Sequence, residues 1–255
     1  PIIESRDGGI HRLHFNRPKV LNAIDTATAQ ALLAALRRLQ DDPALRVLIL
    51  SGEGRSFMAG GDIAQFRDDP AAVPNTLITP LNESMQIIAS LRAPVIASIQ
   101  GPVAGAGMSM ALACDLIVAS REARFGLPEV KRGLAAAGGE LLRLPHRLPY
   151  HVAMECILTG DMLGAERAQS HGLVNRLTEP GGALDAAIEL ARAVAANGPL
   201  SLVASKRVVN ESVDWGREEL FERQAAITNP VFASQDAREG AAAFAEKRKP
   251  VWKAL

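Results

Sequence analysis

The stretch that decides the fold covers residues 94–119 and reads PVIASIQGPVAGAGMSMALACDLIVA. Its two ends, residues 94–99 and 116–119, are short apolar runs, typical of strands that are buried on both faces. Between them, glycines and other small residues lead into a helix predicted over 107–114. A strand that returns through a helix needs a crossover connection, which indicates neighbouring parallel strands. We therefore predict an α/β fold with a largely parallel sheet.

The same alternation of strands and helices extends toward the amino terminus. Residues 10–15 alternate apolar and polar side chains, and residues 47–50 form another apolar run, so both predict strands. Asp25 and Thr26 offer an N-cap to a helix that continues to Gln40 with leucines at helical spacing. A second helical segment, interrupted by two prolines, ends near residue 92.

After Gly138 the sequence becomes rich in Ala and Leu, and helices are predicted to follow one another. One short strand is expected at residues 172–177. The predicted helices cover residues 139–144, 149–158, 164–170, 182–197, 199–213, 215–228 and 235–248. We expect a body over residues 1–200 and a helical C-terminal region over 201–255. No flexible linker separates the two, so this region is expected to pack on the body or on a neighbouring subunit.

Composition argues against several classes of protein. The 255 residues are 48% hydrophobic, which suits one large domain with a sizeable core. The 28 Lys and Arg residues balance 28 Asp and Glu, so no excess of positive charge favours nucleic acid or an anionic membrane. Cys114 and Cys156 lie in apolar runs and are expected to be buried free thiols. Without a long apolar stretch or a signal-like start, the sequence predicts a cytoplasmic protein with no membrane span and no metal site.

Two loops that follow predicted strands are rich in small residues. In residues 56–62, Gly60 and Gly61 would allow backbone N–H groups to face a ligand, with Asp62 capping the next helix. A tight turn that needs glycine is the alternative. In residues 101–111, small residues open a helix whose first N–H groups favour developing negative charge.

The second loop fits an oxyanion hole better than two other motifs. Met110 stands where a dinucleotide-binding fingerprint needs its third glycine. A nucleophile elbow around Ser109 would need a glycine at Ala111 and a position directly on the strand end. An oxyanion hole of main-chain N–H groups requires small residues at a helix start, and these are present.

A third loop presents a carboxylate among apolar neighbours. Glu129 is flanked by Leu127, Pro128 and Val130. Burial there would raise its pKa and make it a proton carrier near neutral pH, whereas an exposed loop glutamate is the alternative.

Taken together, these motifs closely resemble the enoyl-CoA hydratase/isomerase (crotonase) superfamily over nearly the whole chain. The matching residues, in order, are 16–18, 22–23, 57–62, 94–97, 101–107, 114–115, 125–129, 138–139, 158–160, 165–174 and 244–248. Within the superfamily, the ending 243–253 is similar to the carnitinyl-CoA dehydratase branch.

The resemblance implies a crotonase-like spiral of ββα units, with a helical C-terminal region that forms trimers and commonly a hexamer of two trimers. It implies an acyl-CoA thioester substrate and no separate cofactor. The thioester oxygen would lie between the backbone N–H groups of Gly61 and Ala106, which stabilise an enolate.

One position departs from the family pattern. Hydratases of this family use two glutamates, and Ser109 stands where one of them is expected, while Glu129 matches the other. A serine without a neighbouring base cannot deprotonate water near neutral pH, so the sequence favours a double-bond isomerase over a hydratase or dehydratase. Glu140, the nearest other carboxylate in the sequence, is a possible second acid/base, with a capping or surface role as the alternative.

The resemblance also implies residues that bind CoA. They are Arg17, Lys19, Asn22, Ala23, Ala59, Phe244 and Lys247, with Lys247 reaching the CoA of a neighbouring subunit. A solvated helix end is the alternative for Lys247. Two rival functions stay open: a thioester hydrolase with Ser109 as nucleophile and His146, His151 or His171 as base, and a catalytically silent CoA-binding protein.

Overall fold

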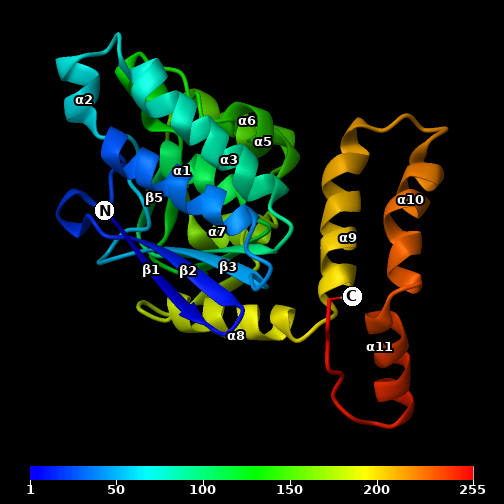
Figure 1. The fold of residues 1–255 in the computed structure, drawn as a ribbon. Helices are drawn as coiled ribbons and strands as arrows, with labels where there is room; N and C mark the ends of the chain where they lie inside the picture. Colours follow the sequence, from blue (N-terminus) through cyan, green and yellow to red (C-terminus); the bar gives the residue numbers. More distant parts are fainter. Residues whose placement is uncertain (255) are drawn as a thin grey trace.

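The computed structural model describes residues 1–254 and contains a main sheet with strand order β1-β2-β3-β4-β6-β9 (Figure 1). Only the β1–β2 pair is antiparallel among these neighbours, so the predicted parallel sheet is confirmed. The strands are β1 (Ile2–Asp7), β2 (Ile10–Phe15), β3 (Val47–Gly52), β4 (Val95–Ile99), β6 (Leu116–Ser120) and β9 (Arg176–Thr178).

Helices cover both faces of this sheet, which explains why its central strands are apolar on both sides. Val47, Ile49 and Ile96 pack against α8 (Ala183–Ala195) on one face. Their neighbours Leu48 and Leu50 belong to the larger core on the opposite face. That core includes buried residues of α1 (Thr26–Gln40), α3 (Thr79–Ser90) and α4 (Ala106–Ala113).

A second, small sheet is formed by strands that directly follow strands of the main sheet. It has the order β5-β7-β8, with β5 (Pro102–Ala104), β7 (Arg124–Gly126) and β8 (Leu163–Gly164). Strand β4 of the main sheet leads into β5 and then α4. Likewise, β6 leads into β7 and then a 3₁₀ helix at Pro128–Arg132. These repeated ββα units place the starts of α4 and of the 3₁₀ helix next to each other, because β5 pairs directly with β7.

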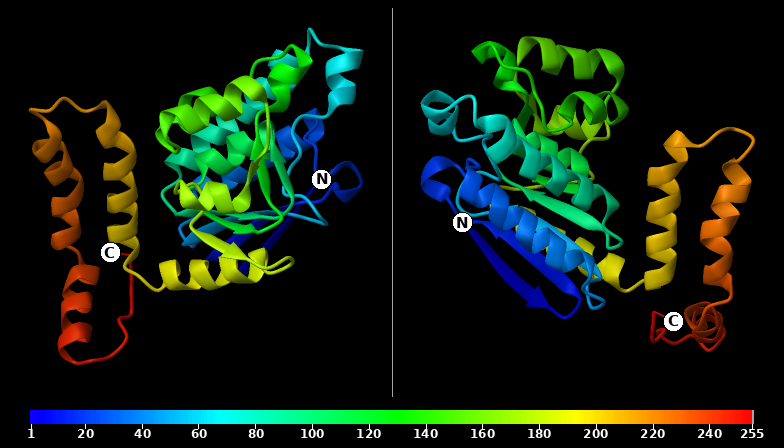
Figure 2. Two further views of the ribbon diagram at one scale, coloured as in Figure 1. Left: turned by 180° about the vertical axis from the view of Figure 1, so that it is seen from behind. Right: turned by 45° about the horizontal axis from the view of Figure 1, so that its top comes forward.

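The remaining helices belong to the body or to a carboxyl-terminal arm. Those of the body are α2 (Ile63–Asp68), a π-helix at Pro74–Ile78, α5 (Glu140–Arg143), α6 (Tyr150–Thr159) and α7 (Ala165–Ser170). The arm contains α9 (Pro199–Glu211), α10 (Leu220–Phe232) and α11 (Gln235–Ala245), and in all views α10 and α11 lie away from the body (Figures 1 and 2).

A partly buried ion pair joins the arm to the body. The ammonium of Lys206 in α9 lies 2.7 Å from a carboxylate oxygen of Asp115, whose side chain also accepts the backbone N–H of Val95. The rest of the arm presents large apolar side chains: Phe221, Phe232 and Phe244 are 83%, 78% and 89% exposed. An apolar surface of this kind is typical of a region that packs against another chain.

Three details differ from the sequence-based expectations. Strand β9 begins at Arg176, because Gly172 and Leu173 close a turn after α7 by hydrogen bonds to Gln169 and Ala168. Helix α10 begins at Leu220 and not at residue 215. The strands of the second sheet were not predicted, because at two or three residues each they carry too few side chains for a periodic pattern.

The expectation for the two cysteines is confirmed. Cys114 and Cys156 are free and buried, and burial raises the pKa of the Cys114 thiol. In residues 1–254, no helix has both the length and the apolar character needed to cross a membrane.

Candidate functional site

The three loops singled out in the sequence meet at one cavity of about 480 Å³. Gly61, Ala106, Ser109, Glu129 and Glu140 all line it. The rest of its wall is largely apolar and includes Leu77, Ile78, Leu81 and Leu134. An apolar cavity with a few convergent polar groups is typical of a small-molecule site.

Close backbone packing holds the two small-residue loops side by side. The N–H of Ala104 donates to the carbonyl of Met58 over 3.1 Å, and Met58 forms an isolated parallel bridge with Val103. A Cβ on Gly107 would overlap the Met58 carbonyl, and Gly60 has a φ of +117°, in the region that favours glycine. Small residues are therefore needed here so that the loops can touch.

The N–H groups of Gly61 and Ala106 are left without an acceptor in the described part of the chain. Gly61 pairs with Ile24 in a parallel bridge whose hydrogen bonds are made by its neighbours, since Ile24 donates to Gly60 and Asp62 donates to Ile24. In that pattern the N–H of Gly61 itself points to the other side. Ala106 is the first residue of α4, where a backbone N–H has no intrahelical partner and the helix dipole favours negative charge.

Glu129 lies against the start of α4 and has an unpaired carboxylate oxygen. It is the second residue of the 3₁₀ helix, and its Oε1 is so close to Gly105 that a Cβ there would come within 2.6 Å. Its Oε2 is buried and has no hydrogen-bond partner among the described residues. Burial raises the pKa of Glu129, and the negative charge of Glu140 adds to this effect. The carboxyl group is thus suited to carry a proton near neutral pH.

Glu140 is buried beside Ser109, so a surface role for this glutamate is wrong. Glu140 is the first residue of α5 and is only 2% exposed. The hydroxyl of Ser109 donates to its Oε1, and the N–H of Gly138 donates to its Oε2 over 2.7 Å. Gly138 lies before the N-cap residue Gly139, and α5 has no side-chain cap, so the predicted capping role is wrong as well. Glu140 instead forms part of the wall of the cavity.

Ser109 has no histidine partner in the described structure. Its hydroxyl is within hydrogen-bond distance of Glu140 and of the Gly105 carbonyl, and it sits in the first turn of α4. His146, His151 and His171 are absent from both its hydrogen bonds and the cavity wall as described. A nucleophilic serine activated by one of these histidines therefore has no structural support.

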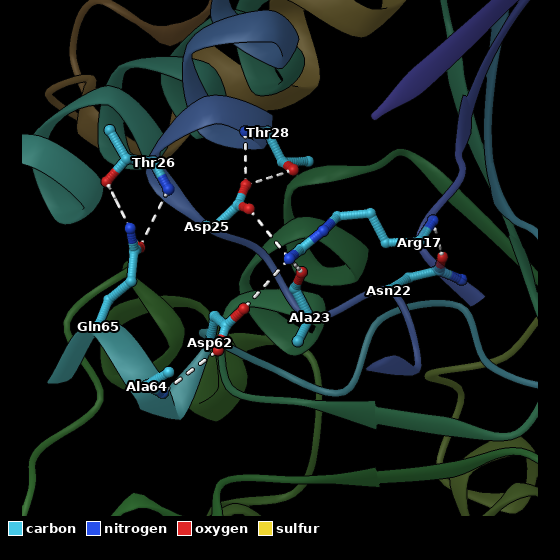
Figure 3. Close-up of polar contacts among 9 residues, drawn as sticks. All are labelled: Arg17, Asn22, Ala23, Asp25, Thr26, Thr28, Asp62, Ala64 and Gln65. Carbon is cyan, nitrogen blue, oxygen red and sulfur yellow. Dashed lines mark hydrogen bonds and ion pairs between the residues drawn. The ribbon is translucent and has the colours of Figure 1, made fainter. Parts of the chain in front are cut away.

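Arg17 anchors the first loop from outside the cavity (Figure 3). Its guanidinium lies 3.0 Å from Asp25 and 3.2 Å from Asp62, and it also donates to the carbonyl of Ala23. Asp62 directly follows Gly61 and caps α2 by accepting the N–H of Ala64, as the sequence predicted. The charge of Arg17 is thus paired within the protein, and its role as a CoA ligand stays a prediction.

The other predicted CoA ligands fall into two groups. Asn22 is buried and holds the chain: it accepts the N–H of Arg17 and donates to the carbonyls of Glu53 and Ser56. Ala59 lines the cavity, and Ala23 lies beside Asn22. Lys19, Phe244 and Lys247 are exposed, the last two on the arm, outside the cavity wall of this chain.

Two pairings in this region were missed by sequence reasoning. Arg17 and Asp62 are 45 residues apart, and Ser109 and Glu140 are 31 residues apart. Neither pair belongs to one helix or to one hairpin, so no local spacing indicates it.

Comparisons with known proteins agree with this architecture. The family model described as enoyl-CoA hydratase/isomerase matches residues 5–254. A carnitinyl-CoA dehydratase of Salmonella arizonae is 38% identical over 98% of this chain and 97% of its own length. The crystal structure of enoyl-CoA hydratase from Mycobacterium tuberculosis H37Rv is 46% identical with a TM-score of 0.91, covering 100% of this chain and 99% of that one. An enoyl-CoA hydratase from Bacillus anthracis is 27% identical with a TM-score of 0.96, over 100% and 99% of the two chains. A match over nearly the whole chain, with the same fold, shows that the chain belongs to the enoyl-CoA hydratase/isomerase family.

Proposed function

We propose that this enzyme moves the α-proton of an acyl-CoA thioester, with Glu129 as acid/base and the N–H groups of Gly61 and Ala106 as the oxyanion hole. The observation that carries the proposal is the buried, unpartnered Oε2 of Glu129 in the cavity that both N–H groups line. A buried carboxylate oxygen without a partner is costly, so its persistence is typical of a functional site.

The chemistry follows from these groups. When Glu129 takes the α-proton, the electrons of the broken C–H bond move onto the thioester oxygen. The two N–H groups stabilise this oxyanion, and one such donor contributes about 3–4 kcal/mol in known enzymes. The start of α4 adds a favourable dipole. Return of the proton to carbon completes an exchange that isomerases and hydratases share.

Two reactions can use this step, and we put the addition and removal of water first. The specific observation in its favour is Glu140, which gives the cavity a second carboxylate beside Ser109. The relatives named as a carnitinyl-CoA dehydratase and an enoyl-CoA hydratase are consistent with this order. Isomerisation of a 3-enoyl-CoA to its 2-enoyl isomer is the second candidate, because Ser109 occupies the position of the hydratase glutamate and Glu129 alone suffices for it.

The test is exchange of the α-protons of butyryl-CoA in deuterated water, followed by mass spectrometry. This substrate has no double bond, so exchange needs only Glu129 and the oxyanion hole. We expect wild type to exchange and Glu129→Gln to be slower by at least about 100-fold, since an amide cannot accept the proton. Binding of butyryl-CoA without exchange would identify a silent CoA-binding protein, and release of free CoA thiol would identify a hydrolase.

A further inference from the structure

Glu140 is a buried carboxylate with no ion-pair partner among the described residues. Its hydrogen bonds come from neutral groups, the Ser109 hydroxyl and the Gly138 N–H. The nearest basic side chain in this turn, Arg143, donates instead toward the Gly138 carbonyl over 3.5 Å. The charge of Arg143 interacts favourably with that of Glu140, but the two side chains form no direct ion pair. A buried carboxylate without a direct ion pair is costly, so a purely structural glutamate is a poor choice here.

The two hydrogen bonds fix the orientation of the carboxylate and leave part of it free. Each oxygen accepts one bond from the protein, whereas a carboxylate has about four lone-pair sites. The backbone enforces the arrangement as well: Gly139 has a φ of +87°, and a Cβ on Gly138 would overlap the Ser109 hydroxyl. The remaining lone pairs can accept a proton from a molecule in the cavity that Glu140 lines.

The cavity thus holds two carboxylates on different elements, both close to the first turn of α4. Glu129 lies against Gly105 and Glu140 is bonded to Ser109, one helical turn further along. The charge of Glu140 is felt at Glu129, where it helps to raise the pKa. Two carboxyl groups in different surroundings can provide an acid and a base in one site.

We propose that Glu140, positioned by Ser109, is the second acid/base of the reaction and acts on the water molecule. In hydration, Glu140 takes a proton from the water molecule while the water oxygen bonds to the β-carbon. The electrons of the double bond then move to the thioester oxygen. Protonated Glu129 then gives its proton to the α-carbon. Transfer of one proton from Glu140 to Glu129 through solvent restores the starting state, and dehydration is the reverse. This inference rests on the proposed function of Glu129.

The experiment compares two reactions in the same preparations. Hydration of crotonyl-CoA needs both carboxylates, whereas α-proton exchange of butyryl-CoA needs only Glu129. We expect Glu140→Gln to lower the kcat of hydration by at least about 100-fold and to change the rate of exchange far less, so that the ratio of the two rates falls. Ser109→Ala should lower the kcat of hydration less, with KM unchanged, since the carboxylate remains but loses one orienting bond. Glu166→Gln, at an exposed glutamate on α7, is the matched control.

Each outcome separates this inference from the function on which it rests. Wild-type hydration in Glu140→Gln would overturn the role of Glu140 and leave that of Glu129 intact. Loss of both reactions in a Glu140→Gln protein with wild-type thermal unfolding would also overturn it, because Glu140 would then shape the oxyanion site. Exchange that survives in Glu129→Gln would instead refute the proposed function.

Discussion

Replacement of Arg17 by Met tests whether this arginine holds the oxyanion loop or binds CoA. In the structure its guanidinium joins Asp25, at the start of α1, to Asp62, next to Gly61 (Figure 3). The Arg17, Asp25 and Asp62 side chains are 24%, 23% and 24% exposed, so the cluster is largely shielded from solvent. Methionine keeps the length of the side chain and removes its charge and donors.

The magnitude follows from these contacts. A hydrogen bond to a charged group contributes about 1.5–3 kcal/mol, and two partly buried carboxylates would lose their cation. Partial exposure reduces the penalty of a buried unpaired charge, so we expect Arg17→Met to lower the free energy of unfolding by about 2–4 kcal/mol. Displacement of Gly61 by about 1 Å should lower kcat/KM by about 100-fold.

The assays are urea unfolding, turnover, and CoA binding by calorimetry. Arg37→Met is the matched control, because Arg37 of α1 forms an exposed ion pair with Glu83 of α3. Such a pair contributes about 0–1 kcal/mol to the free energy of unfolding. A double-mutant cycle with Asp62→Asn should give a coupling free energy of about 0.5–3 kcal/mol. Arg17→Met could instead weaken CoA binding and leave both unfolding and kcat unchanged. That result would refute this reasoning and identify Arg17 as a CoA ligand.

Three further predictions concern the active site and assembly. Gly105→Ala should abolish most turnover with little change in CoA binding, because the new Cβ would lie 2.6 Å from Glu129 Oε1 and the native φ is +51°; unchanged kcat would contradict this. The rate of α-proton exchange should fall as the pH is lowered, because exchange needs ionised Glu129. The midpoint of this fall should lie above about 4.3, the ordinary pKa of glutamate, because burial raises the pKa of Glu129. In Glu140→Gln this fall should move to lower pH, and an unmoved profile would show that the two carboxylates do not interact. Light scattering should show a trimer or hexamer, which Phe232→Asp dissociates, since Phe232 is 78% exposed on the arm; a wild-type monomer would contradict the expected trimer.

Local sequence determined the main elements of this protein because their signals lie within a few residues. The apolar runs at 47–50 and 94–99 became β3 and β4, and the side chains of Asp25 and Asp62 cap α1 and α2. The small residues at Gly61 and Ala106 and the apolar neighbours of Glu129 indicated the three loops of the cavity. Such features act through backbone geometry and hydrogen bonds between near neighbours, so a single sequence carries them.

Tertiary structure alone decided which side chains meet across long distances in the sequence. The sequence left Glu140 between a surface and a catalytic role, and the fold brought it to Ser109, 31 residues away, inside the cavity. The sequence predicted Arg17 as a CoA ligand, and the fold also pairs it with Asp62, 45 residues away. These pairings depend on how the ββα units pack on one another, since β5 beside β7 sets the positions of α4 and of the Glu129 loop. Residue type and spacing cannot specify such a contact, because it is stabilised by the packing of whole elements and not by neighbours along the chain.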